Sequence, residues 1–217
     1  MDLYEAMRCA PTSRDFKADP VPREALVRAL DAARFAPSGG NRQGWRVVVV
    51  EDLQRRIALR ELYLPRWRAY TEQTGAARML ADPESFDERR VRMVRRADVY
   101  ASRLEQVPMH LVVGVRLEDL AVTDAELDRQ SIVGGASVYP FVQNLLLALR
   151  AEGLGAAMTT LLVPAEAEVK ALLEIPDEIA LAAHIGVGYR AGDWPKKLAR
   201  KPVEEFAFSE RFGEPLA

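Results

Sequence analysis

The sequence predicts a layered fold of the α/β or α+β class, in which helices cover a buried β-sheet. Three short runs, 45–50, 109–115 and 179–188, are rich in β-branched residues and apolar along most of their length, as in strands covered on both faces. Stretches with helical periodicity separate these runs. The chain of 217 residues is long enough to bury a full core, and we expect a single domain over residues 1–217.

The first predicted helix covers residues 22–35 and leads into the first strand. Pro22 suits the first helical position, and the apolar residues that follow recur at spacings of four and three. The helix ends before Pro37, because a proline disfavours helical geometry in the residue that precedes it. The strand at 45–50 contains four consecutive valines, which predict a central position in the sheet.

Between about residues 60 and 105 the chain becomes rich in arginine and glutamate, with aromatic residues interspersed. We interpret this segment as a lid-like insertion of one or two surface helices with a loop near residues 82–85. Its arginines are typical of a solvated helix face, and a binding patch is the alternative. Trp67 and Tyr70 are candidate substrate contacts if the segment covers a site. Alternatively, they anchor the segment to the domain.

The helix predicted at 137–152 carries apolar residues on more than one face. Such a helix is buried on several sides, either centrally or in a subunit interface. Pro140 fits only the first turn of this helix. Gly153 supplies a C-terminal stop, after which residues 155–163 return as a short strand.

The composition excludes several classes of function. A formal net charge of −2, with 29% charged residues, offers no general attraction to nucleic acids or anionic membranes. The single cysteine, Cys9, excludes an intramolecular disulfide and favours a reducing compartment. No stretch reaches about 18 uncharged apolar residues. We therefore expect a cytoplasmic protein without a nucleic-acid or membrane partner.

Groups for acid, base or nucleophilic catalysis are scarce. The two histidines, His110 and His184, fall inside predicted strands, where a core role is expected. A Ser-His-Asp triad or a metal site therefore has little support. The glycine-rich stretch 153–158 follows a helix and precedes a strand, the reverse of a dinucleotide-binding motif. These observations indicate that a cofactor supplies the difficult chemistry.

A polar turn joins the first helix to its strand. The string "APSGGNRQGW" (36–45) offers backbone N–H groups, a hydroxyl and an amide, with glycines that allow close approach of a flat ligand. A plain helix-to-strand connection is the alternative. The positions of Asn41, Gln43 and Trp45 favour the binding role, because the whole string resembles the hallmark turn of the FMN-dependent nitroreductase family.

Three further segments resemble the same family, in the same order. They are "TSRDF" (12–16), the helix and strand that begin at "SVYPFVQN" (137–144), and "GYRAGDWPKKLARKPVEEF" (188–206). The resemblance runs from about residue 2 to 206, without 60–105. It implies an α+β, nitroreductase-like fold with a central mixed β-sheet flanked by helices, in an intertwined homodimer.

The resemblance also implies which residues bind FMN. Arg14 would lie near flavin N1 and O2, and Thr12 and Ser13 would contact the ribityl or phosphate oxygens. The backbone at Thr160 and Leu161 would face flavin N5 and O4, and Thr159, directly before them, would also contact the cofactor. The opposite subunit would supply the polar turn and the start of the long helix, through Pro37, Ser38, Gly39, Asn41 and Ser137.

The phosphate of FMN would be bound by Arg200, whose planar guanidinium suits a phosphate. One departure from the family concerns this group: Ala10 and Pro11 stand where many relatives carry arginine. Arg8, one helical turn earlier, is the candidate replacement, with a solvated arginine as the alternative.

For function, the resemblance implies ping-pong hydride transfer from NADH or NADPH, through FMN, to a nitroaromatic, quinone or similar small acceptor. No side chain is required as a catalytic group. Two alternatives remain open. One is specialised flavin chemistry in the same fold, such as dehalogenation, dehydrogenation or flavin breakdown, and the other is a non-catalytic flavin-binding sensor or storage protein.

Overall fold

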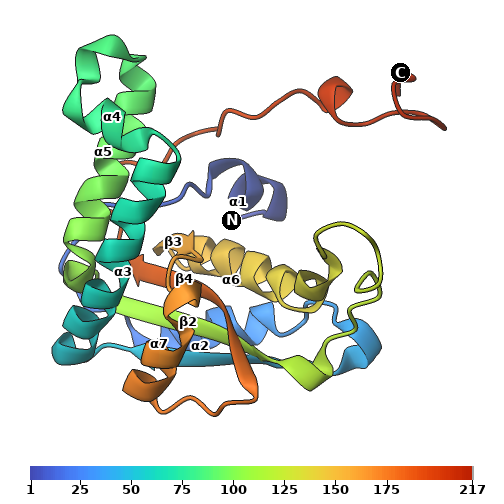
Figure 1. Cartoon of the computed structure of the whole chain (residues 1–217), viewed down its shortest axis with the longest axis horizontal. Coiled ribbons are helices and arrows are strands. Elements are labelled where there is room, and N and C mark those ends of the chain that lie inside the picture. The colour runs from blue at the N-terminus through green and yellow to red at the C-terminus, as the bar shows by residue number, and fades with distance from the viewer. Residues whose placement is uncertain (217) are drawn as a thin grey trace.

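A computed structural model describes residues 1–216 and confirms the α+β class (Figure 1). Strands β1 (Trp45–Val50), β2 (Met109–Arg116), β3 (Gly155–Thr159) and β4 (Ile179–Gly188) form one sheet in the order β1-β2-β4-β3. All three neighbouring pairs are antiparallel, and within residues 1–216 the one parallel pairing is a bridge between Thr12 and Ala156. This differs from the mixed sheet that was predicted, because an apolar run indicates burial but not strand direction.

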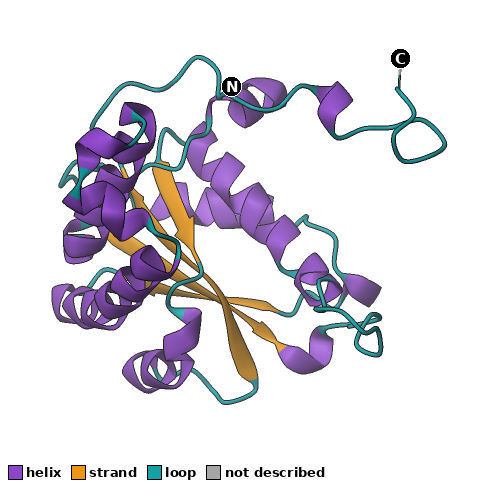
Figure 2. Ribbon diagram, turned by 45° about the horizontal axis from the view of Figure 1, so that its top comes forward, coloured by secondary structure: helices purple, strands orange, loops and turns teal. Residues whose placement is uncertain are grey.

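Helices cover both faces of the sheet, as Figure 2 shows. Helices α2 and α6 pack on one face, and α3, α5 and α7 pack on the other. The helices of the described chain are α1 (Leu3–Cys9), α2 (Arg23–Ala33), α3 (Leu53–Gln73), α4 (Ala76–Ala81), α5 (Glu88–Ser102), α6 (Tyr139–Ala151) and α7 (Glu166–Leu173).

Alternation along β2 divides the core into two layers. Leu111, Val113 and Val115 pack with α2 and α6, whereas Val112 packs with α3 and α5. Successive side chains of a strand point to opposite faces, so a strand that is covered twice is apolar at nearly every position. This explains why the sequence of β2 predicts its burial well.

Strand β1 is an edge strand rather than the central strand that its valines predict. It pairs with β2 alone in the described chain, and four of its six residues are only half-buried. Helices nevertheless cover both of its faces, since Val47 and Val49 pack with one core layer and Val48 and Val50 with the other. An apolar run indicates that both faces of a strand are covered, but it does not indicate how many strands lie beside it.

The two helices that border the predicted site begin and end close to their predicted bounds. Helix α2 begins after Pro22, and α6 has Pro140 in its first turn, where a missing N–H costs nothing. Strand β3 ends at Thr159 rather than near residue 163, because the Thr159 hydroxyl accepts a hydrogen bond from the Leu161 N–H (3.2 Å) and the chain turns there.

The insertion consists of two long helices, α3 and α5, joined through the short helix α4. Their bases belong to the core, where Leu59 and Tyr63 of α3 pack beside Tyr100 of α5. Their tips, with α4, extend beyond the sheet (Figure 1) and enclose a separate small cluster of Met79, Val91 and Val94. Among residues 1–216, no helix combines the length and the apolarity that a membrane span requires.

Candidate functional site

The polar turn between α2 and β1 is folded by its own side chains. The Ser38 hydroxyl accepts a hydrogen bond from the Gln43 N–H (3.0 Å), and Gln43 Nε2 donates to Asn41 Oδ1 (3.0 Å). Gly40 and Asn41 have φ values of 60° and 55°, a left-handed conformation that glycine and asparagine tolerate best. Pro37, Gly40 and Asn41 remain exposed, so this turn presents polar groups to a ligand.

Ser137 lies directly against this turn, 98 residues later in the sequence. Its hydroxyl accepts a hydrogen bond from the Gly39 N–H at 3.0 Å. A Cβ added to Gly39 would sit 3.5 Å from that hydroxyl. The structure therefore brings together the residues that were predicted to act on the opposite subunit's flavin: Pro37, Ser38, Gly39, Asn41 and Ser137.

The N-terminal segment docks on strand β3 at the other end of the sheet. The Ser13 N–H donates to the Ala156 carbonyl (2.8 Å), which leaves Thr12 exposed and Arg14 half-buried. The Ser13 side chain is fully buried, and a Cβ on Gly155 would lie 2.7 Å from its hydroxyl oxygen. Thr12 and Arg14 are thus open to a ligand, whereas Ser13 fills the space that Gly155 leaves.

A cluster of cations lies beside this segment. The Leu198 N–H donates to the Arg8 carbonyl (2.8 Å), and this bond places the basic stretch 196–200 next to α1. Arg8 and Arg200 are both exposed, and neither has a carboxylate partner within residues 1–216. Lys196 and Lys197 were not singled out in the sequence, although they belong to the same stretch and share this lack of a partner.

The turn after β3 is partly engaged within the chain. Thr160 is exposed, but the Leu161 N–H already donates to Thr159 Oγ1, and Thr159 Oγ1 also faces the Tyr63 hydroxyl at 3.5 Å. The Thr160 carbonyl accepts a hydrogen bond from the Val163 N–H (3.0 Å), so each of the two backbones predicted to face flavin already has one group bonded within the chain. Tyr63 is a neighbour of this turn that the sequence did not reveal, because its apolar helical spacing marks it only as a core residue.

The two groups of predicted site residues lie far apart within one chain. Trp45, at the end of the polar turn, is in register with Ala180 of β4 through Val115 of β2. Ala156, whose carbonyl binds Ser13, is in register with Val187 of β4. Seven residues along β4 and three strand spacings across the sheet put the two groups about 25 Å apart. One ring system cannot contact both groups of the same chain.

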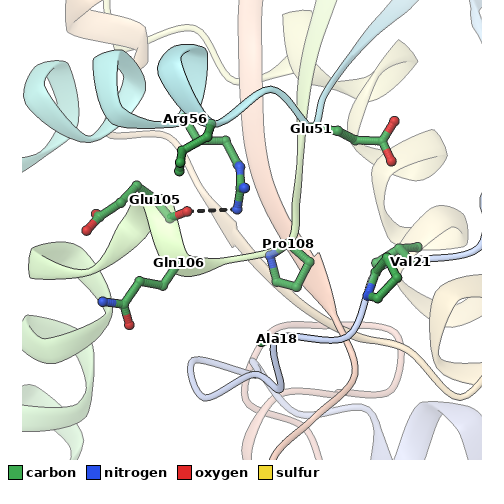
Figure 3. A pocket seen from close by; sticks show the side chains of 9 residues that line it. Ala18, Val21, Glu51, Arg56, Glu105, Gln106 and Pro108 are labelled. Atoms are coloured by element: carbon green, nitrogen blue, oxygen red, sulfur yellow. Dashed lines mark hydrogen bonds between the residues drawn. The ribbon is translucent and has the colours of Figure 1, made fainter.

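Two pockets adjoin the N-terminal segment. The larger, of about 560 Å³, is lined by Val21, Glu51, Arg56, Glu105 and Pro108 among others (Figure 3). It contains no predicted cofactor residue. Arg56 donates to the Glu105 carbonyl (2.8 Å), and both glutamates have arginine ion-pair partners, although Arg56 Nε and Glu105 Oε2 are buried without a hydrogen bond.

The smaller pocket, of about 90 Å³, contains one predicted site residue. It is lined by Arg14 together with Arg103 and Tyr100. The Tyr100 hydroxyl is buried without a partner, and it lies over Gly186, where a Cβ would come within 2.5 Å of it. Burial raises the pKa of this phenol well above its usual range, so that it stays protonated.

The two aromatic residues predicted to contact substrate have different surroundings. Trp67 is buried, and its Nε1–H donates to Asp98 Oδ1 (2.8 Å), which links α3 to α5. Tyr70, one helical turn on, is 46% exposed, and its ring centroid is 6.0 Å from that of Trp67. These contacts favour the anchor interpretation for Trp67 and leave Tyr70 available to a substrate.

We therefore expect alanine substitutions at these two positions to differ in how much they lower the stability of the protein. Trp67→Ala should lower the free energy of unfolding by about 3 to 5 kcal/mol, because it removes a buried indole and its bond to Asp98. Tyr70→Ala should change it by less than about 0.5 kcal/mol. Urea denaturation of the two variants decides the matter, and equal stability losses would contradict the assignment.

The two histidines form a buried pair between the sheet and α5. His110 Nδ1 lies 2.8 Å from His184 Nε2, and His110 Nε2 lies 3.1 Å from the Leu104 carbonyl. Because a carbonyl only accepts, His110 Nε2 carries the proton, His110 Nδ1 accepts, and His184 Nε2 donates. His184 Nδ1 is then an acceptor without a partner. The pair is part of the core, as the sequence predicted.

Comparison with known proteins assigns the chain to a class. Residues 11–189 match the model of the nitroreductase family. The 5,6-dimethylbenzimidazole synthase of Rhodospirillum rubrum is 31% identical over 212 residues, which cover 92% of this chain and 82% of that protein. An NADH dehydrogenase of Thermus thermophilus is 33% identical over 186 residues, covering 82% of each chain.

A solved structure agrees with these matches. Iodotyrosine deiodinase, crystallised with FMN and 3-iodo-L-tyrosine, superposes with a TM-score of 0.69 at 28% identity, over 93% of this chain and 96% of that one. The chain belongs to the nitroreductase family. Its relatives carry different chemistries, so membership of the family defines the fold and the class but not the reaction.

Proposed function

We propose that this protein is an FMN-dependent oxidoreductase that accepts electrons from NADH or NADPH and passes them to a small acceptor, such as a nitroaromatic compound or a quinone. FMN, when bound, supplies the hydride-transfer chemistry. The chain itself binds and orients the cofactor and shields it from water. This proposal requires no catalytic side chain, and it agrees with a chain whose two histidines are both buried in the core.

The basic cluster around Leu198 is the observation that carries the proposal. The backbone bond between Leu198 and Arg8 brings Arg8 beside the stretch that carries Lys196, Lys197 and Arg200, and none of the four has a carboxylate partner in the described chain. Cations left unpaired in this way suit a phosphate dianion, and guanidinium groups suit it best. We infer that Arg8 takes the role of the arginine that the N-terminal motif lacks. The cluster fits the monophosphate of FMN.

Arg14 fits the other end of such a cofactor. It is half-buried, it follows Ser13, which is bonded to β3, and it has no carboxylate partner within residues 1–216. A guanidinium in this place stabilises negative charge on a neighbouring ring. The residues of this chain therefore supply cations for the phosphate and for one edge of the flavin.

The remaining predicted contacts require a second copy of the chain. The polar turn and Ser137 are about 25 Å from the N-terminal group, and a homodimer would bring one chain's turn to the other chain's flavin. Exposed apolar residues agree with such an interface: Phe35 and Ile132 near the turn, Tyr4 on α1, and Phe212 on the C-terminal arm, which extends away from the body (Figure 1).

Specialised flavin chemistry is the second candidate. The dimethylbenzimidazole synthase and the NADH dehydrogenase match this chain about equally well, and the FMN-bound deiodinase shares its fold. The acceptor side of the site, where Tyr70 and the tips of α3 and α5 form the proposed lid, would decide between these reactions.

Anaerobic reduction tests the proposal. The purified protein, loaded with FMN, should be bleached by NADH or NADPH and should regain its colour with a nitroaromatic compound or a quinone. The chromophore released from the protein should be FMN, because the basic cluster at the end of the proposed site would bind a terminal monophosphate. If neither nicotinamide bleaches the flavin but dithionite does, the specialised reactions or a sensor role replace the proposal. A halogenated phenol and oxygen in the acceptor panel then separate those possibilities.

A further inference from the structure

Asp124, outside the proposed site, accepts hydrogen bonds from three different residues. Its side chain is only 5% exposed although it lies in a loop between β2 and α6. One carboxylate oxygen accepts hydrogen bonds from the Ile132 N–H (2.9 Å) and Arg129 Nη1 (2.7 Å), and the other accepts from the Ser131 hydroxyl (2.7 Å). The carboxylate therefore ties together the two ends of the 124–132 loop, which are eight positions apart.

These bonds favour the ionised carboxylate. The Ile132 N–H contributes most, followed by the Ser131 hydroxyl, and together with Arg129 they hold the pKa of Asp124 at about 2. The loop is therefore fixed by a carboxylate that stays charged throughout the physiological pH range.

The loop that Asp124 closes is continuous with the residues that support the polar turn. On one side, a Cβ added to Gly39 would lie 3.9 Å from the Cβ of Ala121. A Cβ added to Gly134 would lie 3.6 Å from the side chain of Val122. On the other side, Ile132 leads directly into the short helix at 133–137, which ends at Ser137. Ala121 on one flank and Ser137 on the other thus both lie next to Gly39.

We propose that Asp124 is a positioning residue: it fixes the 124–132 loop so that Ser137 holds the Gly39 turn in the shape that binds the second subunit's FMN. The alternative is that Asp124 stabilises the fold generally, as any capped loop does. This inference rests on the proposed function for its consequence on FMN, but the order of the turn can be measured in the free protein.

The test compares Asp124→Asn with Asp52→Asn. Asp52 also accepts a backbone hydrogen bond, from the Arg55 N–H (2.9 Å) at the start of α3, but it does not contact the turn. Asp124→Asn should speed amide hydrogen exchange at Gly39 and at 133–137 at least about tenfold, since one lost hydrogen bond to a charged group is sufficient. Asp52→Asn should leave exchange at these amides unchanged.

The FMN dissociation constant, followed by flavin fluorescence, is the second readout, and Asp124→Asn should raise it about tenfold or more. Unchanged exchange at Gly39 overturns the inference, as do equal changes in both variants. A wild-type protein that does not bind FMN defeats the proposed function and leaves the exchange result to decide this inference. If Asp124→Asn does not fold, Ser131→Ala, which removes one of the three side-chain and backbone donors, takes its place with the same expected direction.

Discussion

A mixed dimer in which one chain carries Arg14→Ala and the other carries Asn41→Ala should recover about half of the wild-type activity, although each variant alone is inactive. Arg14 lies in the N-terminal group and Asn41 in the polar turn, and these groups are about 25 Å apart in one chain. If each flavin is held by Arg14 of one chain and Asn41 of the other, the mixed dimer has one site with both defects and one intact site.

The reciprocal combination is a matched control. A chain that carries both substitutions is paired with a wild-type chain, so that the same two changes are present in each kind of dimer. Shared sites predict that each site then has one defect and that activity is lost. Sites built within single chains predict the reverse: half activity in this control and none in the first mixture. Tandem purification with two tags isolates both mixed dimers, and light scattering checks that they remain dimers.

The segments predicted to form the site are those whose pattern is local in the chain. The turn at 36–45 can be recognised because glycine, serine and asparagine must adopt unusual backbone angles within a few residues of one another. The segment at Thr12 and Arg14 likewise carries its own pattern. Helical and strand periodicity predicted the core layers, since each strand that two layers cover is apolar at almost every position.

Contacts made by single polar side chains were not predictable from these patterns. Nothing in the residues around Trp67 indicates that Asp98 accepts its N–H, or that Asp124 is the acceptor for three donors in its own loop. The antiparallel direction of the strands and the edge position of β1 also depend on how the chain connects. Such features follow from tertiary packing, which hydrophobic periodicity does not record.

Acidification from pH 7.5 to pH 5 should destabilise the protein by about 2 kcal/mol through His184 alone, with a further loss through His110. Burial lowers the pKa of His184 to about 4, and burial followed by the charge of His184 holds the pKa of His110 well below its usual range. Protonating His110 would place a proton on Nδ1, facing the N–H of His184, and protonating His184 would charge a ring whose Nδ1 has no partner.

The pKa values of the unfolded chain determine whether acid raises or lowers the free energy of unfolding. There both histidines have ordinary pKa values near 6.5, so below this pH the unfolded state binds more protons than the folded state. The free energy of unfolding is therefore constant above about pH 7 and falls as the pH drops from 6.5 towards 4. Two groups from the packed helices act on the pair: the Tyr63 ring lies 6.0 Å from that of His184, and the charge of Arg56 lowers the pKa of His110 further. Burial raises the pKa of Tyr63, which therefore stays protonated over this pH range.

Because His110 and His184 are the only histidines in the chain, the decline between pH 7 and 5.5 is a direct measure of this pair. Urea denaturation at fixed protein concentration, at half-unit intervals of pH, records it. In His184→Gln the amide N–H can still donate to His110 Nδ1, but one of the two titrating groups is gone, so the slope should fall to about half. If the free energy of unfolding of the wild-type protein stays constant from pH 7 to 5.5, the histidine pair is open to water. The interface between β4 and helices α3 and α5 would then be looser than the contacts of Tyr63 and Tyr100 indicate.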